Sequence, residues 1–274
     1  MTLIDSHCHL DALEFLHEQE LIIKDALEQG VEKIIIPAVN RKSFDDVIEL
    51  SKKFPNCFYA LGFHPMYIGD MKKDDLEILQ SYLKTYEPIA VGEIGLDFFV
   101  TKENQSFQEE VFVSQLKLAN DFDLPVIMHV RQAIDDVLKN LRRYPVKGGI
   151  AHAFNGSLQQ AQMLIELGFK LGFGGAMTYS RATHIKMLAK TLPIESIVLE
   201  TDAPDIPPSW LGHEGRNVPG ELPRIAAYFA ELRGMDLASV IEISHQNTLD
   251  ALLQALTVLW TIISKQPKHY SKTR

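Results

Sequence analysis

Short apolar runs rich in β-branched residues alternate along the chain with longer segments in which apolar residues recur every three or four positions. The short runs predict buried strands, and the longer segments predict amphipathic helices. The predicted strands are Leu3–Asp5, Lys33–Val39, Cys57–Leu61, Ile89–Glu93, Val126–His129, Gly149–His152, Phe169–Phe173 and Ile197–Thr201. The predicted helices are Asp11–Gln29, Ser43–Lys53, Leu76–Tyr86, Gln105–Phe122, Ala133–Arg143, Leu158–Leu167, Ala182–Thr191, Leu222–Arg233 and Leu237–Leu256.

The strand–helix alternation predicts the fold class. Eight such units in about 250 residues are what a single (β/α)₈ TIM barrel of the α/β class requires. An open, doubly wound parallel sheet is the alternative that the alternation alone leaves open. In the barrel, the carboxyl ends of all strands surround one mouth, and an active site is expected there.

Polar side chains follow most of the predicted strands at that end. These residues are His7 and His9, His64, Glu93, His129, His152 and Asp202. Each has an ordinary alternative, such as a hydrogen-bonded core histidine or a carboxylate in a buried ion pair. All of these alternatives would have to hold together, each at the end of a strand, so we expect the residues to form one site.

The residue types in this set favour a metal centre. His7 and His9 are two positions apart, so that both rings point to the same face of a strand and can bind one divalent ion. A carboxylate such as Glu93 is costly to bury in an apolar strand unless it is paired or metal-bound. Cys8 points the other way and is expected to pack as a small apolar residue. We interpret Asp97 as an orienting group or loop cap rather than a ligand.

Four histidines and two carboxylates together predict two divalent ions, bridged by one carboxylate and sharing a water whose pKa is lowered toward neutrality. Nitrogen and oxygen ligands without thiolate fit Zn²⁺, Mn²⁺, Fe²⁺ or Mg²⁺ and do not decide among them.

Composition narrows the class of protein. The 274 residues are 46% hydrophobic and 23% charged, which excludes a disordered or fibrous chain. With 27 basic and 36 acidic residues the net charge is −9, which argues against a broad nucleic-acid-coating face but not against a local phosphate site. Two cysteines, no visible signal peptide and no apolar run of membrane-spanning length predict a cytoplasmic location and no membrane partner.

Six motifs, in this order, resemble those of the TatD family of metal-dependent deoxyribonucleases, which are amidohydrolase-like TIM barrels. They are Asp5–Asp11, Gly62–Pro65, Val91–Asp97, Pro125–His129, His152–Gly156 and Leu199–Pro204. The resemblance covers residues 1–253. Residues 254–274 form a separate, basic end of unknown role: either the end of a packed last helix with a solvated tip, or a tail that contacts a membrane surface or nucleic acid.

The resemblance implies a role for each matching residue. His7 and His9 are expected to bind the first metal with Asp202, Glu93 to bridge both ions, and His129 and His152 to bind the second. Asp202 and Glu93 are then the catalytic residues, and Asp202 orients or deprotonates the attacking water. His64 is expected to donate a hydrogen bond to the substrate phosphate. Arg216, which lies outside the six motifs, is also expected to contact the substrate.

The implied activity is that of a hydrolase acting on ester bonds, namely a phosphodiesterase or exonuclease-like deoxyribonuclease at DNA ends. The expected partner is DNA or a small phosphoester, and the chain is expected to be a monomer. The alternative is an amidohydrolase-type enzyme that cleaves a C–N or C–O bond of a small metabolite. Glu93 favours the first activity, because a carboxylated lysine at the end of the fourth strand would favour the second. Gln132, Val218 and Met66 depart from the family pattern and leave the substrate open.

Overall fold

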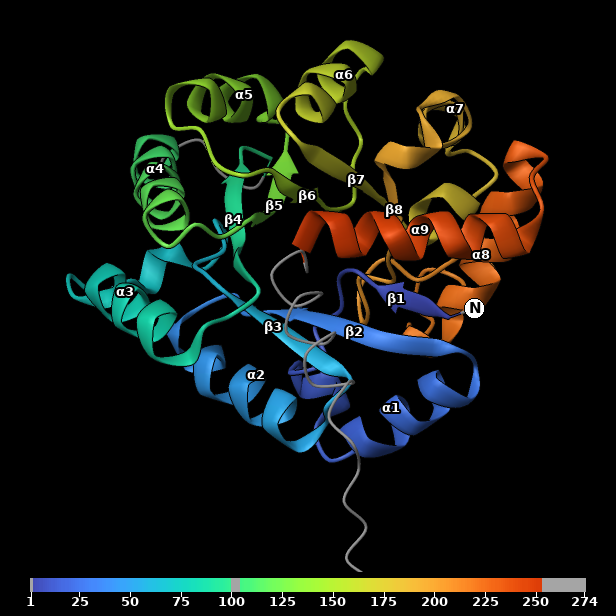
Figure 1. Cartoon of the computed structure of the whole chain (residues 1–274), viewed down its shortest axis with the longest axis horizontal. Coiled ribbons are helices and arrows are strands. Elements are labelled where there is room, and N and C mark those ends of the chain that lie inside the picture. Colours follow the sequence, from blue (N-terminus) through green and yellow to red (C-terminus); the bar gives the residue numbers. More distant parts are fainter. Residues whose placement is uncertain (1, 100–103, 253–274) are drawn as a thin grey trace, which may run out of the picture.

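Eight parallel strands and their intervening helices form a nearly closed barrel in the computed structural model, which describes residues 2–99 and 104–252 (Figure 1). The strands are β1 (Leu3–Asp5), β2 (Val31–Pro37), β3 (Cys57–Leu61), β4 (Ala90–Asp97), β5 (Val126–Arg131), β6 (Gly149–Ala151), β7 (Phe169–Phe173) and β8 (Ile197–Leu199). The helices are α1 (Gln19–Glu28), α2 (Arg41–Lys53), α3 (Asp75–Tyr86), α4 (Gln105–Asp121), α5 (Ile134–Arg143), α6 (Leu158–Glu166), α7 (Thr183–Thr191), α8 (Leu222–Arg233) and α9 (Leu237–Leu252).

The order of the strands confirms the TIM barrel and excludes the doubly wound sheet. Each strand pairs in parallel with the next one in the chain, from β1 to β8. Hydrogen bonds then join the two ends of the sheet, from Ser6 N to the Leu199 carbonyl (3.2 Å) and from Asp202 N to the His7 carbonyl (2.9 Å). The segments that follow β1 and β8 therefore lie side by side, and both carry predicted ligands.

Helix α9 lies across the amino-terminal end of the barrel (Figure 1). Leu252 and Leu249, near its end, pack against a cluster of buried residues from the strands, among them Ile4, Ile35 and Ile127. The helix contacts β1, β6, β7 and β8. Because α9 covers this end, the carboxyl end of the barrel is the one available to a ligand.

The boundaries of several predicted elements are wrong. Asp11–Gln29 is not one helix: a 3₁₀ turn at Leu13–Phe15 precedes α1, and His17 between them has a φ of 69° that no α-helix accommodates. Strand β4 continues four residues past Glu93 to Asp97. Helix α9 begins at the predicted residue, and what was predicted after Leu252, including the basic tail, lies outside the described residues.

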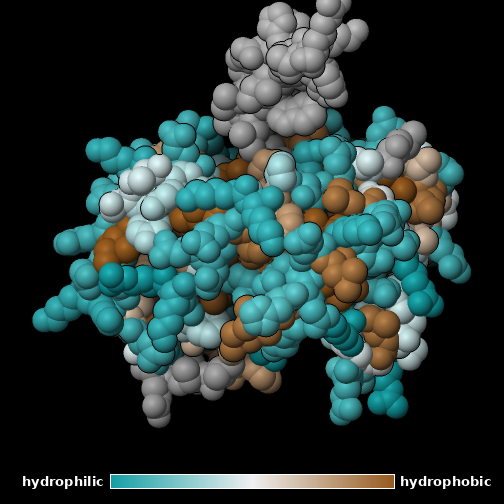
Figure 2. Space-filling model, turned by 90° about the horizontal axis from the view of Figure 1, so that it is seen from below, coloured by the Kyte–Doolittle hydropathy of each residue, from teal (hydrophilic) through white to brown (hydrophobic). Residues whose placement is uncertain are grey.

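On the face that includes α1 and α2, the outer surface is typical of a globular protein. In Figure 2 this face is mostly hydrophilic, with hydrophobic side chains in small, separated groups. Among the described helices, none combines the length and apolar character needed to cross a bilayer.

Candidate metal centre

Glu93 lies at the centre of the predicted site, and its two carboxylate oxygens face different histidines. Oε1 lies 2.8 Å from His152 Nε2, 3.3 Å from His129 Nδ1 and 3.3 Å from His64 Nε2. Oε2 lies 3.2 Å from His7 Nε2 and 3.4 Å from His9 Nε2. Strand β4 buries this side chain almost completely, with 1% of its surface exposed. The carboxylate is therefore placed between two sets of nitrogen donors.

His7 and His9 follow β1 rather than lying within it, yet their rings come together as the spacing predicts. Their Nε2 atoms are 3.2 Å apart, and Asp202 Oδ1 lies 3.5 Å from the first and 3.7 Å from the second. Asp202 has a φ of 57°, in the left-handed region, and its N–H donates to the His7 carbonyl. Cys8, between the two histidines, is fully buried in the apolar core, as predicted.

His64, which follows β3, and His129, on β5, both lie near Glu93 Oε1 but differ in which ring nitrogen carries the proton. His129 Nε2 lies 2.9 Å from the Asp97 carboxylate, which makes Nε2 the protonated nitrogen and leaves a lone pair on Nδ1, facing Glu93. His64 Nδ1 instead accepts the Met66 N–H at 3.1 Å, so its proton is on Nε2. His129 is thus prepared to bind a metal, whereas His64 is prepared to donate a hydrogen bond.

A second layer of buried carboxylates holds the ligand segments in place. Glu200 accepts the Ala153 N–H at 2.6 Å, next to His152, and Gly172 makes room for it, because a Cβ there would lie 2.1 Å from Glu200 Oε2. Asp5 accepts from Thr201 Oγ1 at 2.6 Å and from Thr201 N at 2.9 Å, next to Asp202. These bonds fix the chain on both sides of the predicted ligands.

The pKa values show how strongly these buried groups depend on one another. Burial alone raises the pKa of Glu93, but His152, His64 and His7 outweigh it and hold the pKa well below its usual range. Burial alone lowers the pKa of His152, but the Glu93 carboxylate raises it to about 10. Burial raises the pKa of Asp202 well above its usual range and that of Glu200 to about 7. Without a cation, the cluster therefore holds extra protons.

Several buried atoms have no hydrogen-bond partner among the described residues. Five of the eight belong to this cluster: both oxygens of Glu93, Nδ1 of His7 and of His152, and one oxygen of Glu200. Leaving such groups unpaired is costly, so their concentration at one point indicates a ligand. Three groups of donor atoms lie close enough to hold an ion: His7, His9 and Asp202; His7, Glu93 and His152; and His64, Glu93 and His129. The residues present therefore fit divalent cations.

A cavity of about 740 Å³ opens above this cluster. The loops after β1 and β3 line one side of it with exposed apolar side chains: Leu13 is 82% exposed, Met66 52% and Tyr67 49%. The loop after β8 contributes Asp205 and Ile206. The cavity is large enough for a group the size of a nucleotide, with the candidate metal ligands at its base.

The structure brings all predicted metal ligands together but does not bring Arg216 to them. Arg216 pairs with Glu18 at 2.9 Å, donates to the Glu14 carbonyl at 3.2 Å, and does not line the cavity. Its predicted contact with the substrate has no support in this geometry, because its guanidinium is occupied by α1 and the preceding turn. Val218, which departs from the family pattern, is also outside the cavity lining.

Other residues near the site were missed from the sequence. Phe99, Arg131 and Asn155 lie beside the cavity, where a neighbouring pocket begins. Arg131 is two residues after His129, and Asn155 is three after His152. Their short separation in sequence from predicted ligands could have indicated that they lie near the site. Gln132, noted as a departure from the family pattern, lines the same pocket.

Comparisons with known proteins agree with this geometry. The model of the family described as TatD related DNase matches residues 4–252. An uncharacterized metal-dependent hydrolase of Escherichia coli, YjjV, is 38% identical over 249 residues, 89% of this chain and 95% of the relative. YabD of Bacillus subtilis, also an uncharacterized metal-dependent hydrolase, is 32% identical over 247 residues, 89% and 96% of the two chains. The crystal structure of YjjV superimposes with a TM-score of 0.86, over 91% of this chain and 97% of that one, at 36% identity. The chain belongs to the TatD family and is a metal-dependent hydrolase.

Proposed function

We propose that this hydrolase is a phosphodiesterase, a deoxyribonuclease that acts on DNA ends through two divalent ions. The observation that carries the proposal is the position of Glu93. Its two oxygens face separate sets of histidines at 2.8–3.4 Å, which is the arrangement a bridging carboxylate needs. A single ion would leave one of these sets without a role.

The residues would divide between two sites. His7, His9 and Asp202 would hold one ion. His129 and His152, whose nitrogens lie 3.3 Å and 2.8 Å from Glu93 Oε1, would hold the other, with Glu93 shared. The donors suit Zn²⁺, Mn²⁺, Fe²⁺ or Mg²⁺. When bound, such ions supply positive charge for the phosphoryl oxygens and a water nucleophile at neutral pH.

Two residues would then act on the substrate itself. Asp202 lines the cavity, with Oδ1 3.5 Å from His7 Nε2 and 3.7 Å from His9 Nε2, so its carboxylate is placed to accept the proton that the attacking water loses. His64 lines the cavity and carries its proton on Nε2, 3.3 Å from Glu93 Oε1, and this N–H would donate to a phosphate oxygen of a bound ester. The first role removes a proton from the nucleophile, and the second orients the ester and neutralises charge.

The shape and charge of the site favour a strand end over the middle of a duplex. The apolar side chains of Leu13, Met66 and Tyr67 line the open cavity and provide a surface against which a base can rest. The net charge of −9 provides no broad attraction for a duplex backbone. The proposed partner is therefore the end of a DNA strand, or a small phosphoester, bound by a monomer in the cytoplasm.

A panel of substrates tests the proposal. Chelator-treated protein is supplied with Zn²⁺, Mn²⁺, Fe²⁺ or Mg²⁺ in turn and incubated with single-stranded DNA, duplex DNA, RNA, a model phosphodiester and a cyclic amide. We expect metal-dependent hydrolysis of the phosphodiesters, with single-stranded DNA ends preferred. Hydrolysis of the cyclic amide alone would overturn the proposal in favour of amidohydrolase chemistry.

A further inference from the structure

A second cavity of about 570 Å³ adjoins the metal-side cavity, between the loops that follow β5 and β6. The two cavities share Val130, Arg131 and Asn155 in their linings, so a ligand that extends from one can enter the other. None of the candidate metal ligands lines the second cavity, which we call the side pocket. Its chemistry is therefore separate from that of the metal centre.

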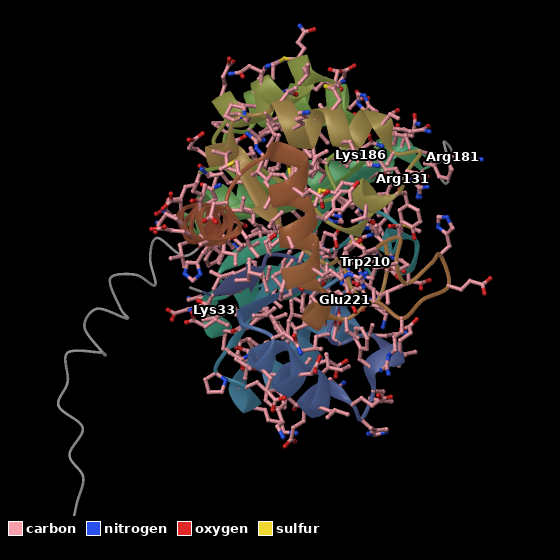
Figure 3. The ribbon with its side chains drawn as sticks, turned by 90° about the vertical axis from the view of Figure 1, so that its right-hand side faces the viewer. Lys33, Arg131, Arg181, Lys186, Trp210 and Glu221 are labelled. Carbon is pink, nitrogen blue, oxygen red and sulfur yellow. The ribbon has the colours of Figure 1, made fainter. Side chains whose placement is uncertain are left out.

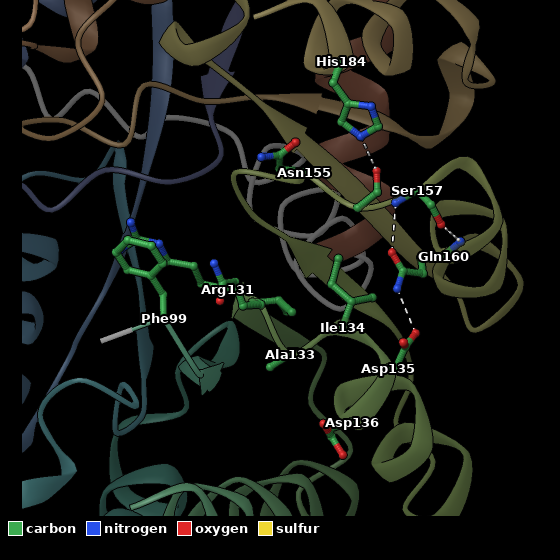
Figure 4. A pocket seen from close by; sticks show the side chains of 13 residues that line it. Phe99, Arg131, Ala133, Ile134, Asp135, Asp136, Asn155, Ser157, Gln160 and His184 are labelled. Atoms are coloured by element: carbon green, nitrogen blue, oxygen red, sulfur yellow. Dashed lines mark hydrogen bonds between the residues drawn. The ribbon is translucent and has the colours of Figure 1, made fainter. Parts of the chain in front are cut away.

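Arg131 and Phe99 form one wall of the side pocket (Figure 4). The Arg131 guanidinium carbon lies 3.7 Å from the centre of the Phe99 ring, which makes the pair a flat, stacked surface. Within residues 2–99 and 104–252, the guanidinium has no ion pair and makes no hydrogen bond. Arg131 thus offers a planar face and free N–H donors to a ligand.

The opposite wall is held by its own hydrogen bonds (Figure 4). Gln160 accepts the Ser157 N–H at 2.9 Å and donates to Asp135 at 2.8 Å, and His184 Nε2 lies 2.9 Å from the Gly156 carbonyl. These side chains are already paired, so the wall has a fixed shape.

Asn155 and the charged residues of the side pocket indicate what it can bind. Asn155 has no hydrogen-bond partner in the described part of the chain, and its amide can both donate and accept. Asp135 and Asp136 stand in the first turn of α5 and carry two negative charges against the one positive charge of Arg131. A second phosphate is disfavoured by this balance, whereas a flat, uncharged ring with a hydrogen-bonding edge is compatible with it.

We propose that the side pocket binds the nucleobase of a nucleotide next to the scissile phosphate. The base stacks on the Arg131–Phe99 surface, and Asn155 forms hydrogen bonds with its edge. This inference rests on the proposed phosphodiesterase function and adds a specificity site to it. It requires that base to be unstacked and unpaired, which explains why a strand end would be the substrate.

The test compares a short single-stranded DNA with the same strand carrying an abasic tetrahydrofuran residue on one side or the other of the scissile phosphate. Methyl p-nitrophenyl phosphate serves as a small diester that reports the metal chemistry alone. For wild-type protein we expect kcat/KM to fall about 10-fold or more when one of the two bases is missing, in line with the effect of a single stacked base. The ratio of kcat/KM for intact and abasic strands is the readout, because it cancels any general loss of activity.

Arg131→Ala and Asn155→Ala should bring this ratio close to one. Arg181→Ala is the matched control, because it removes an exposed arginine from the loop after β7, outside both cavities, and should keep the wild-type ratio. Figure 3 shows Arg131 and Arg181 on the same side of the molecule, so both substitutions remove a charge from that side.

The outcomes separate the two proposals. If wild-type protein hydrolyses the small diester but treats intact and abasic strands alike, or if Arg131→Ala and Asn155→Ala both leave the ratio unchanged, the side-pocket inference is overturned and the phosphodiesterase proposal stands. If no phosphodiester is hydrolysed with any metal, the proposed function fails, and the inference falls with it.

Discussion

The carboxylate of Asp97, at the end of β4, lies 2.9 Å from Nε2 of His129 on the neighbouring strand β5. His129 Nδ1 then points to Glu93, 3.3 Å away. The three residues form a chain in which an outer carboxylate orients an imidazole toward the shared centre. Such partners fix the ring orientation and increase the basicity of the nitrogen that binds the metal.

Replacing Asp97 should therefore weaken metal binding without removing a ligand. We expect Asp97→Asn to lower the affinity of the site at His129 by about 10- to 100-fold, because the ring loses its charged partner. Metal titration against a competing chelator measures the effect. Asp75→Asn, a buried carboxylate at the start of α3 and away from the cavity, is the control. Unchanged affinity in Asp97→Asn would show that the pair does not tune the metal site.

Asp202→Asn should separate catalysis from metal binding. The substitution keeps the shape and one oxygen donor but removes the basicity, so we expect kcat to fall by about 10²-fold or more while metal content falls only modestly. Glu200→Gln is the matched comparison, because Glu200 contacts the Ala153 N–H rather than the cavity, and it should lower kcat less. Near wild-type turnover of Asp202→Asn at saturating metal would mean that Asp202 is not the base.

The stability of the metal-free protein should fall as the pH rises. The pKa of His152 in the folded protein, about 10, exceeds its ordinary value of 6.5, so the charged ring stabilises the fold at low pH and this contribution is lost as the pH rises toward 10. Glu200, with a pKa raised to about 7, acts in the same direction at lower pH, because its ionisation is disfavoured in the fold.

Thermal unfolding of chelator-treated protein between about pH 7.5 and about pH 9 measures this dependence, because the lowered pKa values of His7, His9 and His64 oppose it only near and below their ordinary value of 6.5. We expect the Tm to decrease over that range, and the decrease to be smaller in His152→Gln and in the metal-loaded protein. A Tm of the metal-free protein that rises with pH would contradict the account, because it would mean that the cluster holds no extra protons.

The two cysteines should be inert in the native protein. Burial raises the pKa of the Cys57 thiol to about 12 and that of Cys8 well above its usual range, so neither forms the reactive thiolate near neutral pH. A thiol reagent should label neither cysteine in native protein and both after unfolding in guanidinium. Rapid labelling of either cysteine in the native protein would contradict this expectation.

The sequence predicts the ligand set because each ligand lies in the carboxyl-terminal part of a strand or just after it, and strand order alone brings such positions to one mouth. It predicts the bounds of an element less well where the backbone conformation of a single residue sets them. The periodicity of Asp11–Gln29 is typical of one helix, but the positive φ of His17 interrupts it. Leu13, which precedes the interruption, lines the cavity.

Side-chain contacts between distant segments are also hard to predict from the chain. Arg216 is predicted to contact the substrate, yet it pairs with Glu18 and is not among the residues that line the cavity. Arg131 carries no such motif, and its place in the side pocket depends on stacking against Phe99 from the preceding strand's loop. These positions depend on partners far apart in sequence, which hydrophobic periodicity does not reveal.

The bridging role of Glu93 is the central claim, and the metal stoichiometry of Glu93→Ala tests it most directly. Wild-type protein, Glu93→Ala and the control Asp205→Ala, which loses a carboxylate from the same cavity, are titrated with metal by calorimetry and their metal content is measured after gel filtration. The account predicts about two ions per chain in wild type and control, and a weakening of both sites in Glu93→Ala. Two ions bound by Glu93→Ala with wild-type affinity would contradict it.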